Sequence, residues 1–139
     1  MANDCTLCQQ SGGELLWQND FCRVVLVDDK QLAGMCRVIA QQHIKEMSDL
    51  NPAQQIAMMQ VVFAVEKVMR EVLRCDKINL ASLGNKTPHL HWHIMPRYHD
   101  DAHFPESIWA APQRPMKALD SALLRSFTAQ LQQHLNQIA

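Results

Sequence analysis

His89-Leu90-His91-Trp92-His93-Ile94-Met95-Pro96-Arg97 is the most informative stretch of this sequence. Its histidines alternate with large apolar residues, the period of a β-strand whose successive side chains point to opposite faces of a sheet. His89, His91 and His93 are therefore expected on one face, with neighbours about 6.5–7 Å apart along the strand. The apolar residues between them are typical of a core-facing row. We therefore expect the three imidazoles on an open face or in a cleft.

The segments around this strand predict an α+β fold with an antiparallel sheet. Short apolar runs at 15–17 and 22–27 flank a polar turn and predict a hairpin, with a third strand at 35–40. Two further strands are expected at 78–83 and 90–95, and the loop between them is short enough for an antiparallel pair. Strands that occur in groups, rather than in alternation with helices, are typical of α+β proteins.

Two helices are expected to complete the fold. Asn51 is a good N-cap and Pro52 a good first helical residue, so a helix is predicted over 52–74. Its apolar residues recur every three or four positions, as do those of a second predicted helix at 116–138. The segment 97–115 is interrupted by prolines and is expected to be irregular, with 99–103 as a polar surface loop. The two apolar stripes are Met58, Val61, Val65, Val68 and Val72, and Leu124, Phe127, Leu131, Leu135 and Ile138.

Composition limits the class of protein. A chain of 139 residues and 15.9 kDa has the length of one domain, and 47% hydrophobic residues support a core. A net charge of −1 argues against binding nucleic acid or an anionic membrane through bulk charge. The first residues have neither the basic nor the apolar region of a signal peptide. With an odd number of cysteines, 5, we expect reduced thiols and a cytoplasmic protein without nucleic-acid or membrane partners.

Two groups of residues can carry chemistry. A row of imidazoles can act as a nucleophile at neutral pH, because its pKa is about 6.5, or can bind a metal. Cys5-Thr6-Leu7-Cys8 can be half of a zinc site, a redox pair or two free thiols. A redox pair is disfavoured because the motif does not follow a strand, and a structural zinc requires two more ligands. The other cysteines (Cys22, Cys36 and Cys75) lie in apolar segments and are expected in the core.

The stretch 89–95 resembles the His-φ-His-φ-His-φ-φ signature, with φ apolar, of the histidine-triad (HIT) nucleotide hydrolases and transferases. The segment 36–43 is similar to a strand of that family that ends in a histidine. Asn79 is similar to the family's asparagine near the ribose and phosphate. The resemblance runs from about Cys5 to Arg97. It implies a single HIT-like domain over 1–139, with a triad core at 5–97 and a C-terminal extension and helix at 98–139. It also implies that the long helix packs on the antiparallel sheet.

The resemblance implies roles for the histidines. His91 would attack the α-phosphorus of a nucleotide and form a covalent nucleotidyl-histidine. His93 would lie where the leaving group collects a proton, and His89 would set the geometry. Asn79 and Asn85 would bind the nucleotide, and the base would occupy an apolar slot near 25–27. The implied substrates are a nucleoside phosphate, a dinucleoside polyphosphate such as diadenosine tetraphosphate, or a nucleoside phosphoramidate. The implied assembly is a homodimer.

The resemblance also completes a metal site. Many bacterial histidine-triad proteins share a zinc ion between an N-terminal Cys-x-x-Cys and two histidines. The matching positions here are Cys5, Cys8, His43 and His89. We therefore expect a structural Zn²⁺ and no organic cofactor.

Several positions depart from the family pattern. Met35 stands where many members have a fourth active-site histidine, and Lys86 where they often have Ser or Thr. Asn85 replaces a common glutamine, and residues 40–42 replace Pro-Lys-x. The nucleophile is unchanged, so the departures affect the choice of substrate rather than the reaction class. Two other functions remain open at this point: a nucleotide-binding regulatory module with little turnover, and a zinc-stabilised interaction protein whose histidines are all ligands.

Overall fold

A five-stranded antiparallel sheet lies at the centre of the computed structural model, which describes residues 4–29 and 31–138. The first three residues, which are part of the segment compared with signal peptides above, lie outside the described residues. Among the helices of the described residues, none is long and apolar enough to cross a membrane. The strands follow the order β1-β2-β3-β5-β4 and are β1 (Glu14–Gln18), β2 (Cys22–Leu26), β3 (Cys36–Ala40), β4 (Lys77–Ala81) and β5 (His91–Arg97).

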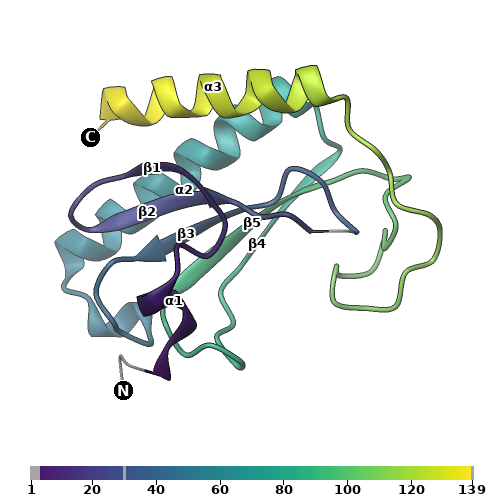
Figure 1. Ribbon diagram of the computed structural model, residues 1–139. Helices are drawn as coiled ribbons and strands as arrows, with labels where there is room; N and C mark the ends of the chain where they lie inside the picture. Colours follow the sequence, from purple (N-terminus) through teal and green to yellow (C-terminus); the bar gives the residue numbers. More distant parts are fainter. Residues whose placement is uncertain (1–3, 30, 139) are drawn as a thin grey trace.

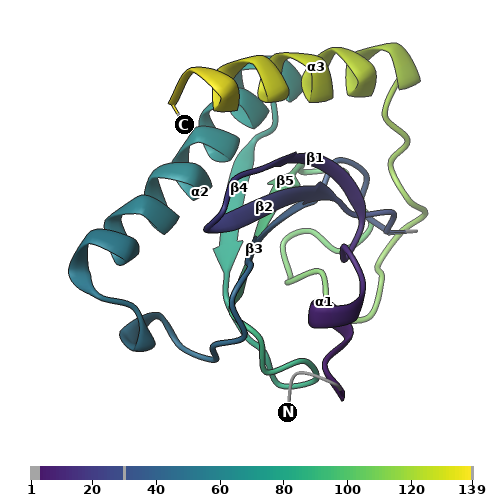
Figure 2. The ribbon, with the colours of Figure 1, turned by 60° about the vertical axis from the view of Figure 1, so that its left-hand side comes forward.

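Two long helices cover one face of this sheet, as Figures 1 and 2 show, with α2 (Pro52–Leu73) and α3 (Ser121–Ile138) packed on each other. A short helix α1 (Thr6–Gln9) precedes β1, and a 3₁₀ turn η2 (Met47–Asp49) precedes α2. The predicted cap of α2 is confirmed, because the Asn51 and Gln54 side chains each accept from the other's backbone N–H. The α+β fold and its antiparallel sheet are therefore as predicted.

The hydrophobic core lies between the helices and the sheet. Val65 of α2 is fully buried, as are Val38 and Ile94 of the facing strands. At about 25 cal/mol per Å² of apolar surface removed from water, such a layer is the main stabilising term of the fold. The stripe predicted for the long helix is confirmed, since Met58, Val61, Val65 and Val68 are buried and Val72 is partly buried against the core.

The last helix begins later than predicted. It starts at Ser121 rather than Met116, because the Asp120 side chain accepts from the Ala122 N–H and its carbonyl from the Leu124 N–H. These bonds satisfy orphan donors of the first turn, which is the function of an N-cap. Phe127, Leu131 and Leu135 are fully buried as expected, whereas Ile138 is 45% exposed at the end of the helix.

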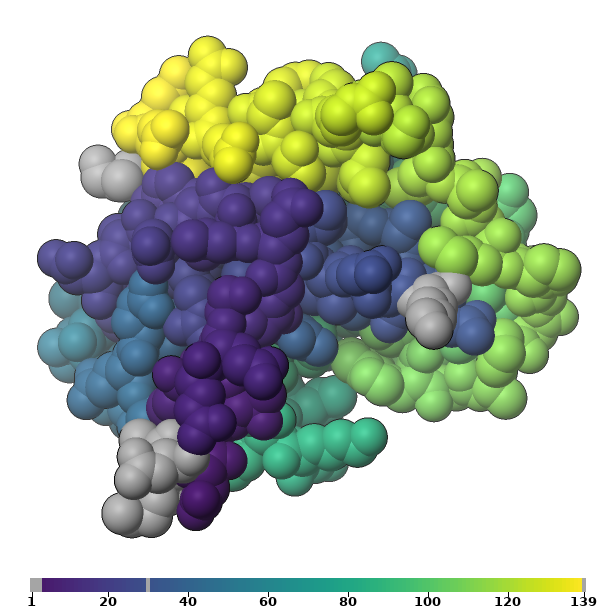
Figure 3. Space-filling view, in the orientation of Figure 1, coloured from purple at the N-terminus to yellow at the C-terminus, as the bar shows by residue number. Residues whose placement is uncertain are grey.

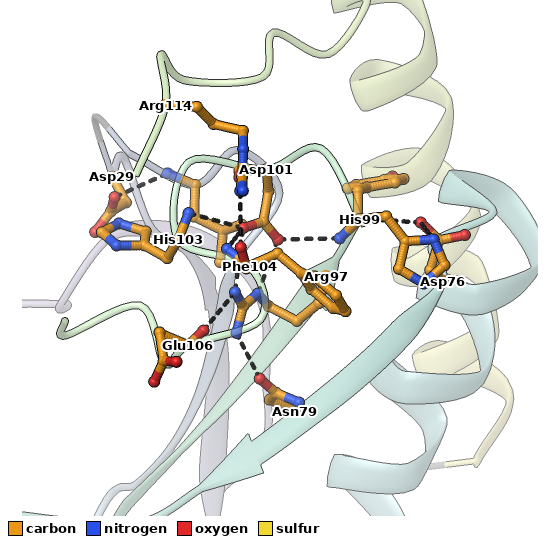
Figure 4. A network of polar contacts seen from close by, with 12 residues as sticks. Asp29, Asp76, Asn79, Arg97, His99, Asp101, His103, Phe104, Glu106 and Arg114 are labelled. Atoms are coloured by element: carbon orange, nitrogen blue, oxygen red, sulfur yellow. Dashed lines mark hydrogen bonds and ion pairs between the residues drawn. The ribbon is translucent and has the colours of Figure 1, made fainter. Parts of the chain in front are cut away.

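The prediction that 99–103 forms a polar surface loop is wrong for 101–103, whereas His99 and Asp100 are exposed as expected. Asp101 and His103 are 1% and 2% exposed, because Arg97 at the end of β5 is itself buried and requires a counter-ion. Its Nε donates to Asp101 Oδ2 at 2.9 Å and its Nη2 to Oδ1 at 3.1 Å (Figure 4). Arg114 ties the far end of the loop to the carbonyls of Asp101 and Phe104. The segment is thus an ordered polar layer at one end of the sheet.

Candidate active site and metal centre

The strand β5 separates its side chains as the alternation predicts. Ile94 faces the helices, and Trp92 lies partly buried beside Met47, to whose sulfur its Nε1–H donates at 3.5 Å. His91 and His93 face the other side, opposite Ile39 and Arg37 of β3. That side is not open, however. His89, His91 and His93 are only 1%, 8% and 6% exposed, because the N-terminal segment and neighbouring loops cover them.

His91 has a defined protonation pattern. Its Nδ1 lies 2.6 Å from the carbonyl oxygen of His89. Because a carbonyl only accepts, Nδ1 must carry the proton and Nε2 the free lone pair. Burial lowers the pKa of His91, and the positive charge of Arg37 lowers it further against the opposing effect of the carbonyl bond. The imidazole is therefore neutral at pH 7, with one nitrogen available for attack.

His93 completes a pair with His91. Their ring centroids are 5.0 Å apart in an edge-on arrangement. Burial lowers the pKa of His93 to about 4, with smaller contributions from His91 and Arg37. The edge of a third ring, Trp109, lies against it at 5.2 Å between centroids, although Trp109 is itself 52% exposed. Trp109 thus lies at the edge of the site.

A pH dependence follows for His93. Its pKa of about 4 lies below the unfolded value of about 6.5, so the unfolded state binds more protons between these pH values. Stability is therefore expected to fall as pH drops through this window, by at most about 3 kcal/mol from this residue. Urea unfolding at pH 7.5 and 4.5 should show a smaller pH-dependent loss in His93→Gln. The exposed His99→Gln control should keep the wild-type loss, and equal losses in all three proteins would contradict the assignment.

Four residues converge at the base of β5 as a candidate metal centre. One ligand atom from each of Cys5, Cys8, His43 and His89 lies within 4.8 Å of all the others. Cys8 Sγ is 3.2 Å from His43 Nδ1 and 3.5 Å from His89 Nδ1, and Cys5 Sγ is 3.4 Å from His89 Nδ1. A tetrahedral zinc with Zn–S of about 2.3 Å and Zn–N of about 2.0 Å separates its ligand atoms by about 3.3–3.8 Å. These Cys₂His₂ residues therefore fit a structural zinc.

The outer contacts of His89 support the same fit. Its Nε2 lies 2.6 Å from the carbonyl oxygen of Ala40, so Nε2 carries the proton and Nδ1 is free to bind metal. Histidine ligands of metals usually donate their second N–H to such an acceptor. His89 thus faces the metal centre through one edge, while its own carbonyl orients His91.

Removing the two thiols should detach the N-terminal segment. In Cys5→Ser/Cys8→Ser, we expect zinc content to fall from one ion per chain to near zero and Tm to fall by several degrees, because ligand assembly couples metal binding to folding. Atomic absorption and thermal unfolding measure both effects. Cys75→Ser, a change outside the cluster, is the matched control. Full zinc occupancy in the double variant would disprove the site.

The other residues predicted for the site lie apart from the metal centre. Asn79 shares the sheet face of the histidines, but its Oδ1 accepts from Arg97 Nη1 at 2.8 Å and belongs to the buried loop network (Figure 4). Asn85 and Lys86 are exposed in the loop before β5. Met35 is 2% exposed and packs on Leu32 and Met95. It therefore takes no polar part in the site.

A cavity of about 300 Å³ opens beside His91. It lies between the N-terminal segment and the loop before β5, which Figure 3 shows next to each other at the bottom of the molecule. The predicted apolar slot is not this cavity, since Val25 is fully buried against Leu7 and Ile39. The cavity also contains a residue that the sequence analysis missed, Arg37. The remaining lining is largely small and polar and consists of Thr6, Leu7, Gln10, Ser11, Gly12, Gly13 and Thr87.

A buried histidine pair beside a cavity, with one imidazole oriented by the carbonyl of a third histidine, defines a histidine-triad site. The comparison with protein families agrees, since the model of the HIT domain matches residues 9–100, more than half of the chain. The chain belongs to the HIT domain family.

Solved structures have the same fold. A histidine triad protein from Bradyrhizobium japonicum is 26% identical, with a TM-score of 0.75 over 89% of this chain and 91% of that one. One from Marinobacter aquaeolei is 28% identical, with a TM-score of 0.74 over 93% of each chain. A zinc-bound histidine triad family protein from Mycobacterium smegmatis is 23% identical, with a TM-score of 0.67 over 96% and 99%. No curated protein matches this chain.

Proposed function

We propose that this protein transfers a nucleoside monophosphate group from a nucleotide substrate to water through a covalent bond to His91. Membership of the HIT family supports a nucleotide-related hydrolase or transferase. The observation that carries the proposal is the 2.6 Å bond from His91 Nδ1 to the His89 carbonyl, which leaves Nε2 unprotonated beside a cavity. A nucleophile held in one tautomer and orientation avoids the entropy of positioning during the reaction.

In the first step, Nε2 of His91 forms a bond to the α-phosphorus as the bond from phosphorus to the leaving oxygen breaks. The imidazole becomes positively charged, and the His89 carbonyl that accepts its Nδ1–H stabilises that charge. In the second step, a water oxygen bonds to phosphorus, the N–P bond breaks and His91 returns to neutral. The proton of the water passes to neutral His93 and then to solvent.

The state of His93 favours one class of leaving group. Because its pKa is about 4, His93 is neutral at pH 7 and has no acidic imidazolium proton to give to a leaving group. A phosphate or polyphosphate can leave as an anion without protonation, whereas an amine requires a proton. We therefore propose a phosphoanhydride substrate, such as a dinucleoside polyphosphate, in preference to a nucleoside phosphoramidate.

Two measurements test this function. Mass spectrometry after mixing with an adenylyl donor should show one added nucleotidyl group on a peptide that contains His91. A substrate panel should give higher kcat/KM for dinucleoside polyphosphates than for adenosine phosphoramidates. Tight nucleotide binding with neither adduct nor turnover would replace the proposal with a nucleotide-binding regulatory module.

We also infer a homodimer that works in a reducing compartment such as the cytoplasm. All five cysteines are free thiols, as zinc ligation by two of them requires. On α2, Ile56 and Phe63 are 60% and 51% exposed on one side of the helix, which offers an apolar surface to a second copy.

Sedimentation at micromolar concentration should give twice the chain mass of 15.9 kDa. Phe63→Glu should shift the protein toward the monomer, because a charge in an apolar interface is costly. Glu71→Gln, an exposed change on the same helix, is the control and should leave the mass unchanged. A wild-type protein that sediments as a monomer would contradict the dimer.

A further inference from the structure

Arg37 is a cationic side chain inside the candidate site to which neither sequence pattern nor family assigns a role. It lies on β3 directly opposite His93 and lines the cavity together with His91. Its Nη1 donates to the carbonyl of Gly12 at 3.0 Å. Its Nε is enclosed without a hydrogen-bond partner, and its Nη2 has none among the described residues. One whole edge of the guanidinium is therefore unpaired.

Unpaired guanidinium donors are not general in this region, as a second arginine shows. Arg23, on the adjacent strand β2, is 7% exposed and also contacts the N-terminal segment. All three of its nitrogens are bonded, Nε to Ser11, Nη1 to Gln41 and Nη2 to the carbonyls of Leu7 and Gln10. Arg23 is thus a structural clamp that is satisfied by protein acceptors. Arg37, in contrast, has N–H donors that no acceptor in the described part of the chain engages.

The charge of Arg37 is also uncompensated. Asp29 raises its pKa slightly against the larger lowering effect of burial, but no carboxylate of the described residues forms an ion pair with it. Among the described residues that line the cavity, Arg37 is the one arginine or lysine.

We propose that Arg37 binds a non-bridging oxygen of the phosphoryl group that His91 attacks, through its unpaired Nη2. A guanidinium N–H that donates to a phosphate oxygen forms a charge-assisted hydrogen bond. Because negative charge spreads over those oxygens as the new bond forms, the interaction strengthens in the transition state. The inference rests on the proposed function and specifies that the site selects a phosphorylated ligand over its nucleoside.

Binding of AMP and adenosine, and of GMP and guanosine, distinguishes this role without turnover. Calorimetry on the wild-type protein should show tighter binding of a nucleotide than of its nucleoside. Arg37→Gln should weaken nucleotide binding at least about tenfold and leave nucleoside binding unchanged, since one charge-assisted contact to the phosphate is lost. Arg37→Lys should retain part of the preference. Arg125→Gln removes an exposed charge from α3 and should behave as wild type.

Single-turnover kinetics provide the second measurement. With an adenylyl donor, Arg37→Gln should slow formation of the His91 adduct by about 100-fold or more, the scale of a lost transition-state donor. If Arg37→Gln weakens nucleotide and nucleoside binding equally, or if the wild-type protein shows no preference for the nucleotide, the Arg37 proposal is overturned even if His91 is labelled. If the wild-type protein forms no adduct, the proposed function is overturned instead. In that case, a nucleotide preference that is lost in Arg37→Gln still supports the contact between Arg37 and the phosphate anion. Tm values of Arg37→Gln and Arg37→Lys close to wild type are expected, which would show that loss of the bond to Gly12 does not disturb the fold.

Discussion

His91→Asn is expected to lower turnover by several orders of magnitude, the scale found when a covalent nucleophile is removed. Asn is the informative replacement because its side-chain amide can still donate to the His89 carbonyl, as Nδ1 of His91 does at 2.6 Å. The substitution therefore removes the attacking nitrogen and retains the local hydrogen bond. The opposite row of β5, which packs into the core, is unchanged. Nucleotide binding and Tm should stay close to wild type.

The comparison variants separate the nucleophile from its neighbours. His93→Ala should cost less, because a proton acceptor contributes typically 10²–10⁴-fold and water can replace part of it. His99→Asn changes a histidine whose side chain is 74% exposed outside the site, and should leave turnover unchanged. Single-turnover assays with an adenylyl donor measure all three. Near-native turnover in His91→Asn, together with loss in His93→Ala, would show that the mechanism is wrong.

Asp101→Asn is expected to destabilise the fold by about 3–5 kcal/mol, the cost of leaving one partner of a buried ion pair uncompensated. Asp101 accepts two bonds from Arg97 and three from the backbone N–H groups of Tyr98, His103 and Phe104. Asn has the same shape as Asp but no charge, and its amide NH₂ group would face the N–H donors that now bind the carboxylate. The remaining guanidinium of Arg97, 2% exposed, would stay charged in the protein interior.

Urea unfolding at pH 7 measures this loss, and the adjacent Asp100→Asn is a matched control. Asp100 is exposed and pairs with Lys117 at the surface, a contact that contributes little to stability because solvent screens it. Burial alone would raise the pKa of Asp101, but the bonds from Arg97 and the backbone hold it at about 2. The stabilisation is present above the unfolded pKa of about 3.9 and is lost as pH falls toward 2. Equal stabilities of the two Asn variants would refute the assignment.

The same ion pair links stability to the candidate site. Arg97 and Asp101 hold the beginning of the segment whose later residue Trp109 lies against His93. Arg97 also donates to Asn79, so the residue expected to contact nucleotide is held in this network. A substitution at Asp101 should therefore reduce activity as well as stability.

Local patterns were sufficient for much of the fold. The alternation at 89–95 predicted the two faces of β5, because the period of a strand is a property of the backbone alone. The start of α2 at Pro52 was also readable, since a cap acts on donors within one turn of itself. The candidate metal ligands were predicted from the resemblance, and the structure places all four together.

What the sequence did not determine depends on neighbours that are distant along the chain. A strand predicts its faces but not how deeply they are covered, so the sequence left open whether the histidines lie on an open face or in a cleft, and the structure buries them. The burial of 101–103 follows from the unpaired charge of Arg97, and a counter-ion is identified only when the chain folds back. Arg37 belongs to the site because β3 pairs with β5 in a register that sets it opposite His93. Register arises from the packing of the whole sheet, so only the tertiary structure decided which cation lies opposite His93.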